Sequence, residues 1–287
     1  MQFKQKGPML ILATAVLWSF GGLLIKFIPW DAMTIAGLRA ALAAAVMAIY
    51  MRRPRITFSK PVILGGLALA ATTILFVFAN KLTTAANAIV LQYTAPIYVV
   101  ILSALFLKQR VRALDIVSVI VVFIGIGLFF FDKLEPTALL GNVLACLAGV
   151  AFAGVFFFNR LPGAKPKEAM LLGHLINTVA AIPFIAMGGV SGEPIAWVMI
   201  VLLGVFQLGI AYVLFSVGIK HTPPVAASLI ATLEPLLSPI WVMLFIGETP
   251  GLWALAGGVI VIATIVNYNV RNTKKAKLAK SDEGSDV

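Results

Sequence analysis

Long apolar stretches follow one another along almost the whole chain, and short polar segments separate them. Each stretch has about 20 residues, the length of a helix that crosses the hydrocarbon core of a bilayer. The stretches lack the strict alternation of membrane-spanning strands, and a helix satisfies its own backbone in lipid. The pattern therefore predicts an all-α membrane protein with ten transmembrane helices. The expected spans are 8–28, 31–50, 61–80, 84–107, 113–131, 138–158, 168–188, 195–219, 224–246 and 250–270.

The composition also favours a chain that lies in a bilayer. Hydrophobic residues make up 61% and charged residues 11% of the 287 residues, whereas soluble domains average about 25% charged residues. The connections between the spans are short and often contain Pro or Gly, so no soluble domain is expected. The apolar run after Lys4 and Lys6 resembles a secretory signal, but no small-residue cleavage site follows it. We expect it to be retained as the first helix.

Positive charges gather in alternate connections. If the N-terminus is cytoplasmic, only Lys81 and Lys133 of the 22 Lys and Arg residues lie in connections on the outer side. This positive-inside distribution predicts that both termini are cytoplasmic. It also accounts for the net charge of +11 without nucleic acid, which we do not expect as a partner. The polar segment 272–287 is predicted to be a disordered cytoplasmic tail.

Two parts of the chain come into register when the sequence is shifted by 139 residues. The aligned pairs are Phe76 with Phe215, Lys81 with Lys220, Thr83 with Thr222 and Pro96 with Pro235. A second match joins 17–19 to 151–153 at a slightly different offset. Because each repeat has an odd number of spans, the two halves take opposite orientations, as in many secondary transporters. We expect two inverted five-helix repeats, 1–131 and 132–271, with a substrate site near the midplane between them.

Several segments are typical of a known family. They are LWSFGG in the first span, GLRAALAAAV in the second, TAPIYVVILSALFL in the fourth and LEPLLSPIWVMLFIGE in the ninth, with a Gly-rich last helix in each half. In these segments the chain resembles the drug/metabolite transporter superfamily, in its ten-helix EamA-type branch, over its whole length apart from the tail. The resemblance implies inverted five-helix repeats, a central cavity and transport of small metabolites such as amino acids.

Glu234 lies deep in the ninth span, where a charge is costly and marks a functional site by default. It is about ten residues, or roughly 15 Å, from the start of the span. We interpret it as a site for a proton or a substrate ammonium, and the alternative is a structural partner of Arg39 or a capped helix break. Pro235 and Pro239 follow it, and Pro96 lies in the fourth span. These prolines remove backbone donors and are expected to open the helices near the midplane.

Arg39 lies about 12 Å into the second span from its outer end. Its planar guanidinium can bind the carboxylate of a substrate through two hydrogen bonds. The alternative is a structural ion pair, for which Asp31 and Glu234 are the two candidate partners.

Uncharged polar and aromatic side chains complete the expected cavity. Gln92 and Gln207 are long enough to reach it from opposite halves, whereas interhelical hydrogen bonding accounts for most other polar residues at this depth. Deep aromatic rings offer apolar faces and cation–π contact to an amine, with core packing as the alternative for each. His174 is either a proton relay or a structural histidine. The expected lining residues are Trp18, Ser19, Arg39, Gln92, Tyr93, Gln207, Tyr212 and Glu234.

The residue types favour a carrier over other classes of protein. One cysteine, Cys146, and two histidines, with no HExxH or GxSxG motif, predict no metal, no cofactor and no enzyme activity. A channel stays open as the alternative, although it would need a ring of like charge or a carbonyl filter. We expect a monomeric multi-pass protein of the cell (inner, cytoplasmic) membrane. It would export small polar or amphipathic metabolites by alternating access, with protons as a candidate coupling ion.

Overall fold

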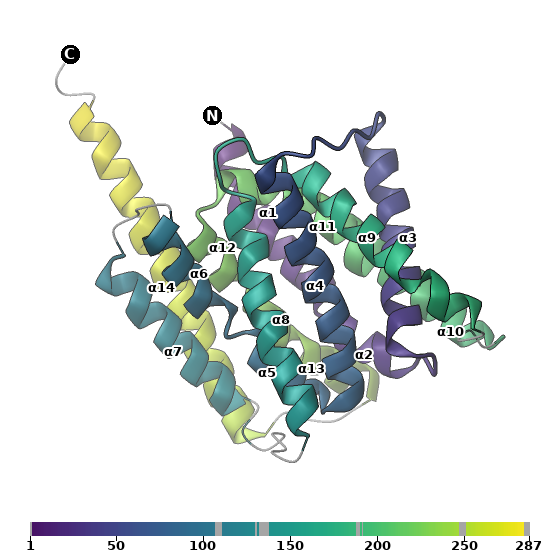
Figure 1. The fold of residues 1–287 in the computed structure, drawn as a ribbon. Coiled ribbons are helices and arrows are strands. Elements are labelled where there is room, and N and C mark those ends of the chain that lie inside the picture. Colours follow the sequence, from purple (N-terminus) through teal and green to yellow (C-terminus); the bar gives the residue numbers. More distant parts are fainter. Residues whose placement is uncertain are drawn as a thin grey trace.

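The computed structural model describes residues 2–106, 111–129, 131, 138–187, 190, 192–246 and 251–283. Among these residues every regular element is a helix (Figure 1). The first half contains α1 (Gln2–Trp18), α2 (Gly21–Lys26), α3 (Ala32–Met51), α4 (Lys60–Leu82), α5 (Ala85–Gln92), α6 (Ala95–Phe106) and α7 (Ala113–Phe129). The second half contains α8 (Leu139–Phe158), α9 (Pro166–Ala186), α10 (Pro194–Val201), η2 (Leu202–Ile210), α11 (Ala211–Gly218), η3 (Ile219–His221), α12 (Pro224–Ala231), α13 (Leu233–Ile246) and α14 (Leu252–Glu283).

The described helices are long and apolar enough for a membrane. Seven segments meet both criteria: Lys6–Lys26, Ala32–Met51, Lys60–Leu82, Asn87–Phe106, Leu139–Phe158, Pro166–Ala186 and Pro194–His221. Three shorter apolar helices accompany them: Ala113–Phe129, Pro224–Ser238 and Leu252–Tyr268. Large apolar side chains such as Ile49 and Leu105 are exposed on the outside of the bundle, where lipid is their natural solvent. The predicted class, an all-helical multi-pass membrane protein, is confirmed, while ten spans and cytoplasmic termini stay predictions.

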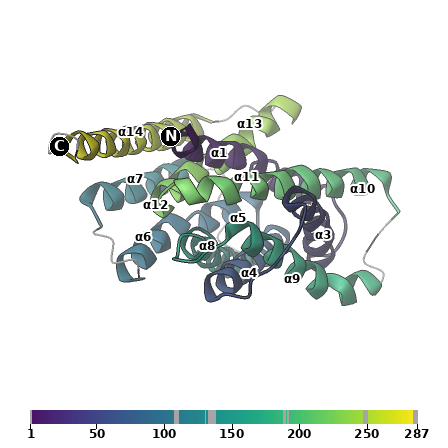
Figure 2. The same cartoon turned by 90° about the horizontal axis from the view of Figure 1, so that it is seen from above.

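The helices of the two halves are interleaved. α4 packs along α8 and α9, α3 packs along α9 and η2, and α1 packs along α11. Seen from above, α7 and α14 lie beside one another at one edge, and α9 and α10 lie at the opposite edge (Figure 2). Small residues permit this close packing: a Cβ atom at Gly37 of α3 would collide with the Cβ atom of Ala181 in α9.

Polar side chains and prolines fix where several helices begin. The Asp31 carboxylate accepts a hydrogen bond of 2.9 Å from the backbone N–H of Thr34, which caps α3. The Thr84 hydroxyl accepts one of 3.1 Å from the N–H of Asn87, which caps α5. Proline lies in the first turn of α4, α9, α10 and α12, where its missing N–H leaves no intrahelical bond unmade.

The fourth and ninth expected spans are each interrupted near the middle. The break between α5 and α6 falls at Tyr93 and Thr94, and the break between α12 and α13 falls at Thr232. Pro96 and Pro235 lie in the first turn of the following helix, so they begin the second helix of each span. Pro239 lies further along α13, and its side chain is outside the described part of the chain.

The structure differs from the sequence expectation at two places. Residues 202–210 form the π-helix η2 inside the eighth span, and apolar periodicity gives no signal for a π-helix. α14 continues to Glu283, into the segment for which the sequence predicts a disordered tail. The Lys, Ala and Leu residues of that segment have high helix propensity, which favours continuation of the helix. Residues 284–287 lie outside the described part.

Glycine sets the closest approach of α7 and α14. A Cβ atom at Gly257 of α14 would collide with the carbonyl oxygen of Gly125 and the backbone nitrogen of Phe129 in α7. We expect Gly257→Ala to lower the free energy of unfolding by about 1–3 kcal/mol, because the two backbones have to separate. Thermal unfolding in detergent, followed by circular dichroism, measures this loss.

The matched control for this prediction is Gly127→Ala in α7, because nothing lies within 4 Å of a Cβ atom at Gly127. The control is expected to unfold at the temperature of the wild type or slightly above it. Equal losses in the two variants would contradict the glycine contact as the cause.

Candidate functional site

A small polar cavity lies at the centre of the bundle. Its volume is about 30 Å³, room for about two water molecules. Both halves of the chain contribute side chains to it, through α1, α3, α4, α5, α8, η2, α11 and α13. The lining residues are Trp18, Arg39, Thr72, Thr73, Phe76, Gln92, Phe152, Gln207, Leu208, Tyr212 and Glu234.

Arg39 places a guanidinium in the wall of this cavity with most of its donors unused. The residue is 1% exposed, and its Nη2 atom donates to the backbone carbonyl of Thr73 at 3.2 Å. Its Nε and Nη1 atoms have no hydrogen-bond partner among the described residues. Asp31 caps α3 through Thr34 and makes no ion pair with Arg39 in the described part. A buried cation with free donors is costly, so the geometry is that of a site for an anion.

Glu234 lies across the cavity in the first turn of α13 and is 7% exposed. Its Oε2 atom accepts a hydrogen bond of 2.5 Å from the Tyr93 hydroxyl, which lies 3.0 Å from the carbonyl of Ala231. Among the described residues no cation forms an ion pair with Glu234. The tyrosine suits both forms of the carboxyl: it donates to the ionised form, and it can accept from the protonated form while donating to Ala231.

Two glutamines face the cavity from opposite halves. Gln207 on η2 donates from Nε2 to the carbonyl of Trp18 at 3.4 Å, and its Oε1 atom has no partner in the described part. Gln92 also has an Oε1 atom without a partner among these residues. These free carbonyl oxygens, one from each half of the chain, suit a ligand that donates hydrogen bonds.

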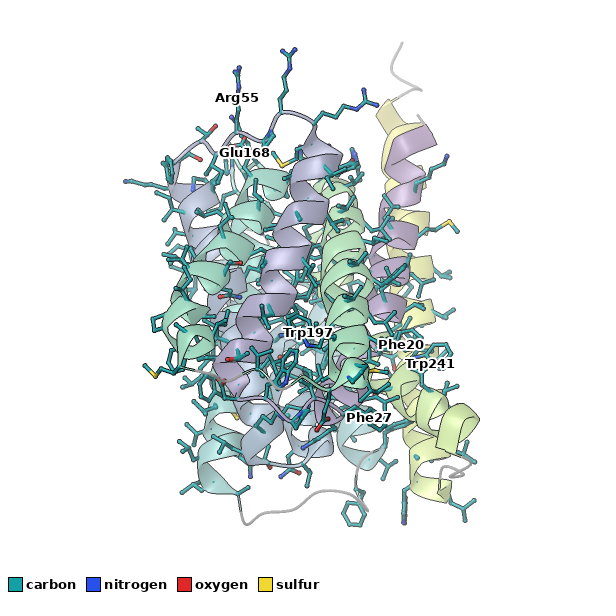
Figure 3. The ribbon with its side chains drawn as sticks, turned by 90° about the vertical axis from the view of Figure 1, so that its right-hand side faces the viewer. Phe20, Phe27, Arg55, Glu168, Trp197 and Trp241 are labelled. Carbon is teal, nitrogen blue, oxygen red and sulfur yellow. The ribbon has the colours of Figure 1, made fainter. Side chains whose placement is uncertain are left out.

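Gln207 also lines a second hollow, which is apolar and has a volume of about 550 Å³. This hollow lies between α1–α2 and α10–η2, and Phe20 and Phe27 are labelled on that side of the molecule in Figure 3. A Cβ atom at Gly21 would lie 2.7 Å from Gln207 Nε2, so a glycine at this position leaves room for the amide. Gln207 therefore separates the polar cavity from the apolar hollow.

Aromatic rings form one wall of the cavity. The ring of Trp18 lies 5.5 Å from Phe152, 5.1 Å from Tyr212 and 5.6 Å from Phe215, measured between ring centroids. His174 lies behind this wall, with its ring 5.1 Å from that of Tyr212 and both nitrogens without a partner in the described part. It is buried but does not line the cavity.

Six of the residues expected at the cavity line it: Trp18, Arg39, Gln92, Gln207, Tyr212 and Glu234. Tyr93 lies behind Glu234 as its hydrogen-bond donor. Ser19 faces α13 instead, where its Oγ accepts a bond of 2.7 Å from Trp241 Nε1. The ring of Trp241 stacks on Phe20 with centroids 4.5 Å apart, at one side of the bundle (Figure 3).

The sequence prediction left out five lining residues: Thr72, Thr73, Phe76, Phe152 and Leu208. Thr72 and Thr73 are adjacent polar residues inside an apolar helix, so a search of the third span for polar residues would have found them. Phe76 and Phe152 belong to the matched positions of the internal repeat. Leu208 carries no signal, because an apolar residue in a membrane helix faces lipid as readily as a cavity.

A multi-pass helical bundle around a buried polar cavity made by both halves of the chain is typical of a membrane transport protein. The chain belongs to the EamA-like transporter family, whose model matches residues 5–131 and 139–269. This match confirms the resemblance found in the sequence.

Proteins similar to this chain are also named as transporters. An uncharacterized transporter of Archaeoglobus fulgidus is 27% identical over 91% of this chain and 95% of its own. The threonine/homoserine exporter RhtA of Escherichia coli is 25% identical over 94% of each chain. A solved crystal structure superposes with a TM-score of 0.77 at 17% identity, covering 91% of this chain and 95% of that one. That structure shows that the fold is shared.

The hydroxyl of Tyr93 is expected to stabilise the fold through its bonds to Glu234 and Ala231. Tyr93→Phe removes only this donor, so we expect it to lower the free energy of unfolding by about 1–3 kcal/mol. The measurement is thermal unfolding of the purified protein in detergent.

Tyr98→Phe is the matched control, because Tyr98 in α6 is only half-buried and forms no hydrogen bond among the described residues. This control is expected to unfold as the wild type does. A Tyr93→Phe protein as stable as the wild type would show that the hydroxyl contributes nothing to the fold.

Proposed function

We propose that this protein is a secondary transporter that exports small zwitterionic metabolites, such as amino acids, across the cell (cytoplasmic) membrane. The substrate would lie in the central cavity, with its carboxylate on Arg39 and its ammonium near Glu234. The main support for this proposal is a pair of opposite charges without charged partners. Arg39 has two unused donor nitrogens, and Glu234 has no cationic partner in the described part.

A zwitterion satisfies both ends of this arrangement at once. The guanidinium fork can hold a carboxylate through two charge-assisted bonds, and a carboxylate with only a tyrosine donor can accept an ammonium. The free Oε1 atoms of Gln92 and Gln207 would accept further bonds from substrate N–H or O–H groups. Relatives named threonine/homoserine exporters support an amino acid as the substrate.

Inverted repeats would supply the motion. The family model matches the chain twice, and each half contains a broken fourth span, α5–α6 and α12–α13. These observations support two five-helix repeats of opposite orientation, with both termini cytoplasmic as the loop charges predict. The cavity of about 30 Å³ is much smaller than an amino acid, so the helices have to part on one side at a time. A cavity of this size favours a carrier over an open pore.

Counterflow into proteoliposomes tests the proposed substrate class. We expect radiolabelled threonine, homoserine or other amino acids to accumulate against a trapped unlabelled pool. Amine analogues without the carboxylate should compete poorly. Arg39→Met is expected to raise the substrate concentration for half-maximal transport at least about 10-fold, because it removes a charged hydrogen-bonding partner. Arg39→Lys should recover only part of this loss of affinity.

Arg55→Met is the control for this test, since Arg55 is exposed at one end of the bundle, away from the cavity (Figure 3). It should transport as the wild type does. No accumulation with any amino acid, from folded protein, would refute the substrate class, and a rapid non-saturable leak would favour the channel alternative.

Proton coupling through Glu234 is the second part of the proposal. A proton and a substrate ammonium would compete for one carboxylate, so acidification should weaken apparent binding, by at most about 10-fold per pH unit for a single site. We expect Glu234→Gln to lose this pH dependence, which counterflow at equal pH on both sides measures. An unchanged pH profile in Glu234→Gln would show that protons act elsewhere or not at all.

A further inference from the structure

Two pairs of helices, each made from both halves, enclose the cavity. In one pair α1 packs along α11, with α2 continuing α1, and in the other pair α4 packs along α8. The α1–α11 pair brings Trp18 and Tyr212 to the cavity, and the α4–α8 pair brings Thr73, Phe76 and Phe152. The two pairs meet at two seams, one between α2 and α4 and one between α8 and α11, and each seam is a route by which a substrate could reach the cavity.

The seam between α2 and α4 is closed at its mouth by a lysine. Lys26, the last residue of α2, donates from Nζ to the carbonyl of Asn80 at 2.6 Å and lies 3.5 Å from that of Thr83, at the end of α4. Lys81 of α4 donates in the other direction, from Nζ to the carbonyl of Ile28 at 2.7 Å. Cations suit these carbonyls, because the C-terminal end of a helix is electronegative.

The seam between α8 and α11 is closed by an arginine. Arg160 follows the end of α8, and its Nη1 atom donates to the carbonyl of Lys220 in η3, directly after α11, at 2.5 Å. One layer deeper, the rings of Phe156 and Phe215 meet edge to face with centroids 5.4 Å apart. The same two helix pairs are therefore joined a second time by a cation and a helix-end carbonyl.

The two closures occupy matching positions in the internal repeat. Lys26 and Arg160 each follow a cavity aromatic, Trp18 or Phe152, by eight residues. That distance is about 12 Å along a helix. The carbonyl that Arg160 binds belongs to Lys220, which the shift of 139 residues aligns with Lys81, the neighbour of Asn80. The same shift aligns Asn80 itself with Ile219, so the two acceptor carbonyls match to within one residue.

The closures lie toward opposite ends of the molecule. Phe27, next to Lys26, lies toward one end in Figure 3, and Arg55 and Glu168 lie at the other. Arg160 lies in the short connection between α8 and α9, and Glu168 lies in the first turn of α9. Arg160 is therefore at the end of the molecule where Glu168 is labelled in Figure 3. Rocking the α1–α11 pair against the α4–α8 pair can therefore break one closure while the other holds.

The Asn80 side chain lies at the first seam without a hydrogen-bond partner in the described part. It is fully buried at the end of α4, and neither its Nδ2 nor its Oδ1 atom has a partner among the described residues. It faces α2, since a Cβ atom at Gly22 would lie 3.7 Å from Nδ2. A buried amide without partners is costly, and water that enters an open seam would satisfy it.

We propose that Lys26 and Arg160 are the two gating residues of this carrier, each closing one mouth of the cavity through a helix-end carbonyl. The proposal rests on the alternating-access function inferred above. Opening toward the face of Lys26 breaks its bonds to α4 together with the Lys81–Ile28 bond and keeps the bond of Arg160. Opening toward the other face breaks the Arg160 bond and keeps those of Lys26 and Lys81.

A reporter thiol in the cavity tests the gates without any substrate. Thr72→Cys is combined with Cys146→Ala, and a membrane-impermeant maleimide is added to vesicles from one face at a time. We expect Lys26→Met to accelerate labelling about 10-fold from the face of Lys26 only, because the open fraction rises when the charged bonds are lost. Arg160→Met should accelerate labelling from the opposite face only.

Two control variants make this test specific. Lys220→Met removes an exposed positive charge at the same end as Arg160 and keeps the carbonyl that Arg160 binds, so it should label as the parent does. Lys26→Arg keeps a donor at the first mouth and should return labelling toward the slow rate, which also excludes misfolding as the cause.

The proposal is overturned if either methionine variant accelerates labelling equally from both faces or leaves it unchanged. It is also overturned if Lys220→Met acts like Arg160→Met, or if Lys26→Arg labels as fast as Lys26→Met. Because labelling needs no substrate, an amino-acid counterflow that fails while the one-sided labelling holds would refute the substrate class and leave the gates intact.

Discussion

A positive charge inside an apolar helix bundle is the constraint on which the centre of this structure depends. Arg39 satisfies one nitrogen on the Thr73 carbonyl, and Asn177 in turn donates to the Thr73 hydroxyl. The tight packing of Gly37 against Ala181 holds α3 against α9 at this level. The Nε and Nη1 atoms of Arg39 have no protein partner in the described part, and the carboxylate of the proposed substrate would supply the missing acceptors.

The sequence predicted the charged and amide members of the cavity because a polar group in a membrane helix has few reasons to be there. Arg39, Glu234 and Gln207 were found in this way. Apolar residues were not, since both the lipid face and the packed face of such a helix are apolar and periodicity cannot separate them. Ser19 faces Trp241 rather than the cavity because the chain turns between α1 and α2, and a local turn of this kind leaves no trace in hydrophobicity.

The two interrupted spans, α5–α6 and α12–α13, place different side chains at the cavity. After the break at Thr232 the ninth span presents Glu234 to the cavity, and the fourth span presents Gln92 just before its own break. Tyr93, at that break, reaches across to Ala231 and Glu234. One break therefore lies next to the acid and the other carries its hydrogen-bond donor, so the two interrupted helices meet beside the cavity.

The lysine pair at the ends of α2 and α4 has a consequence for the empty protein. Lys26 and Lys81 each bond to the other helix end, whereas Lys220, which aligns with Lys81, has an exposed side chain. Two lysines therefore hold one mouth and one arginine holds the other. With unequal closures, a two-state equilibrium would favour the conformation in which the more weakly held mouth is open. If these residues gate the carrier as proposed, gradients would still decide the net flux, but the unequal closures would decide to which side of the membrane the unloaded protein is more often open.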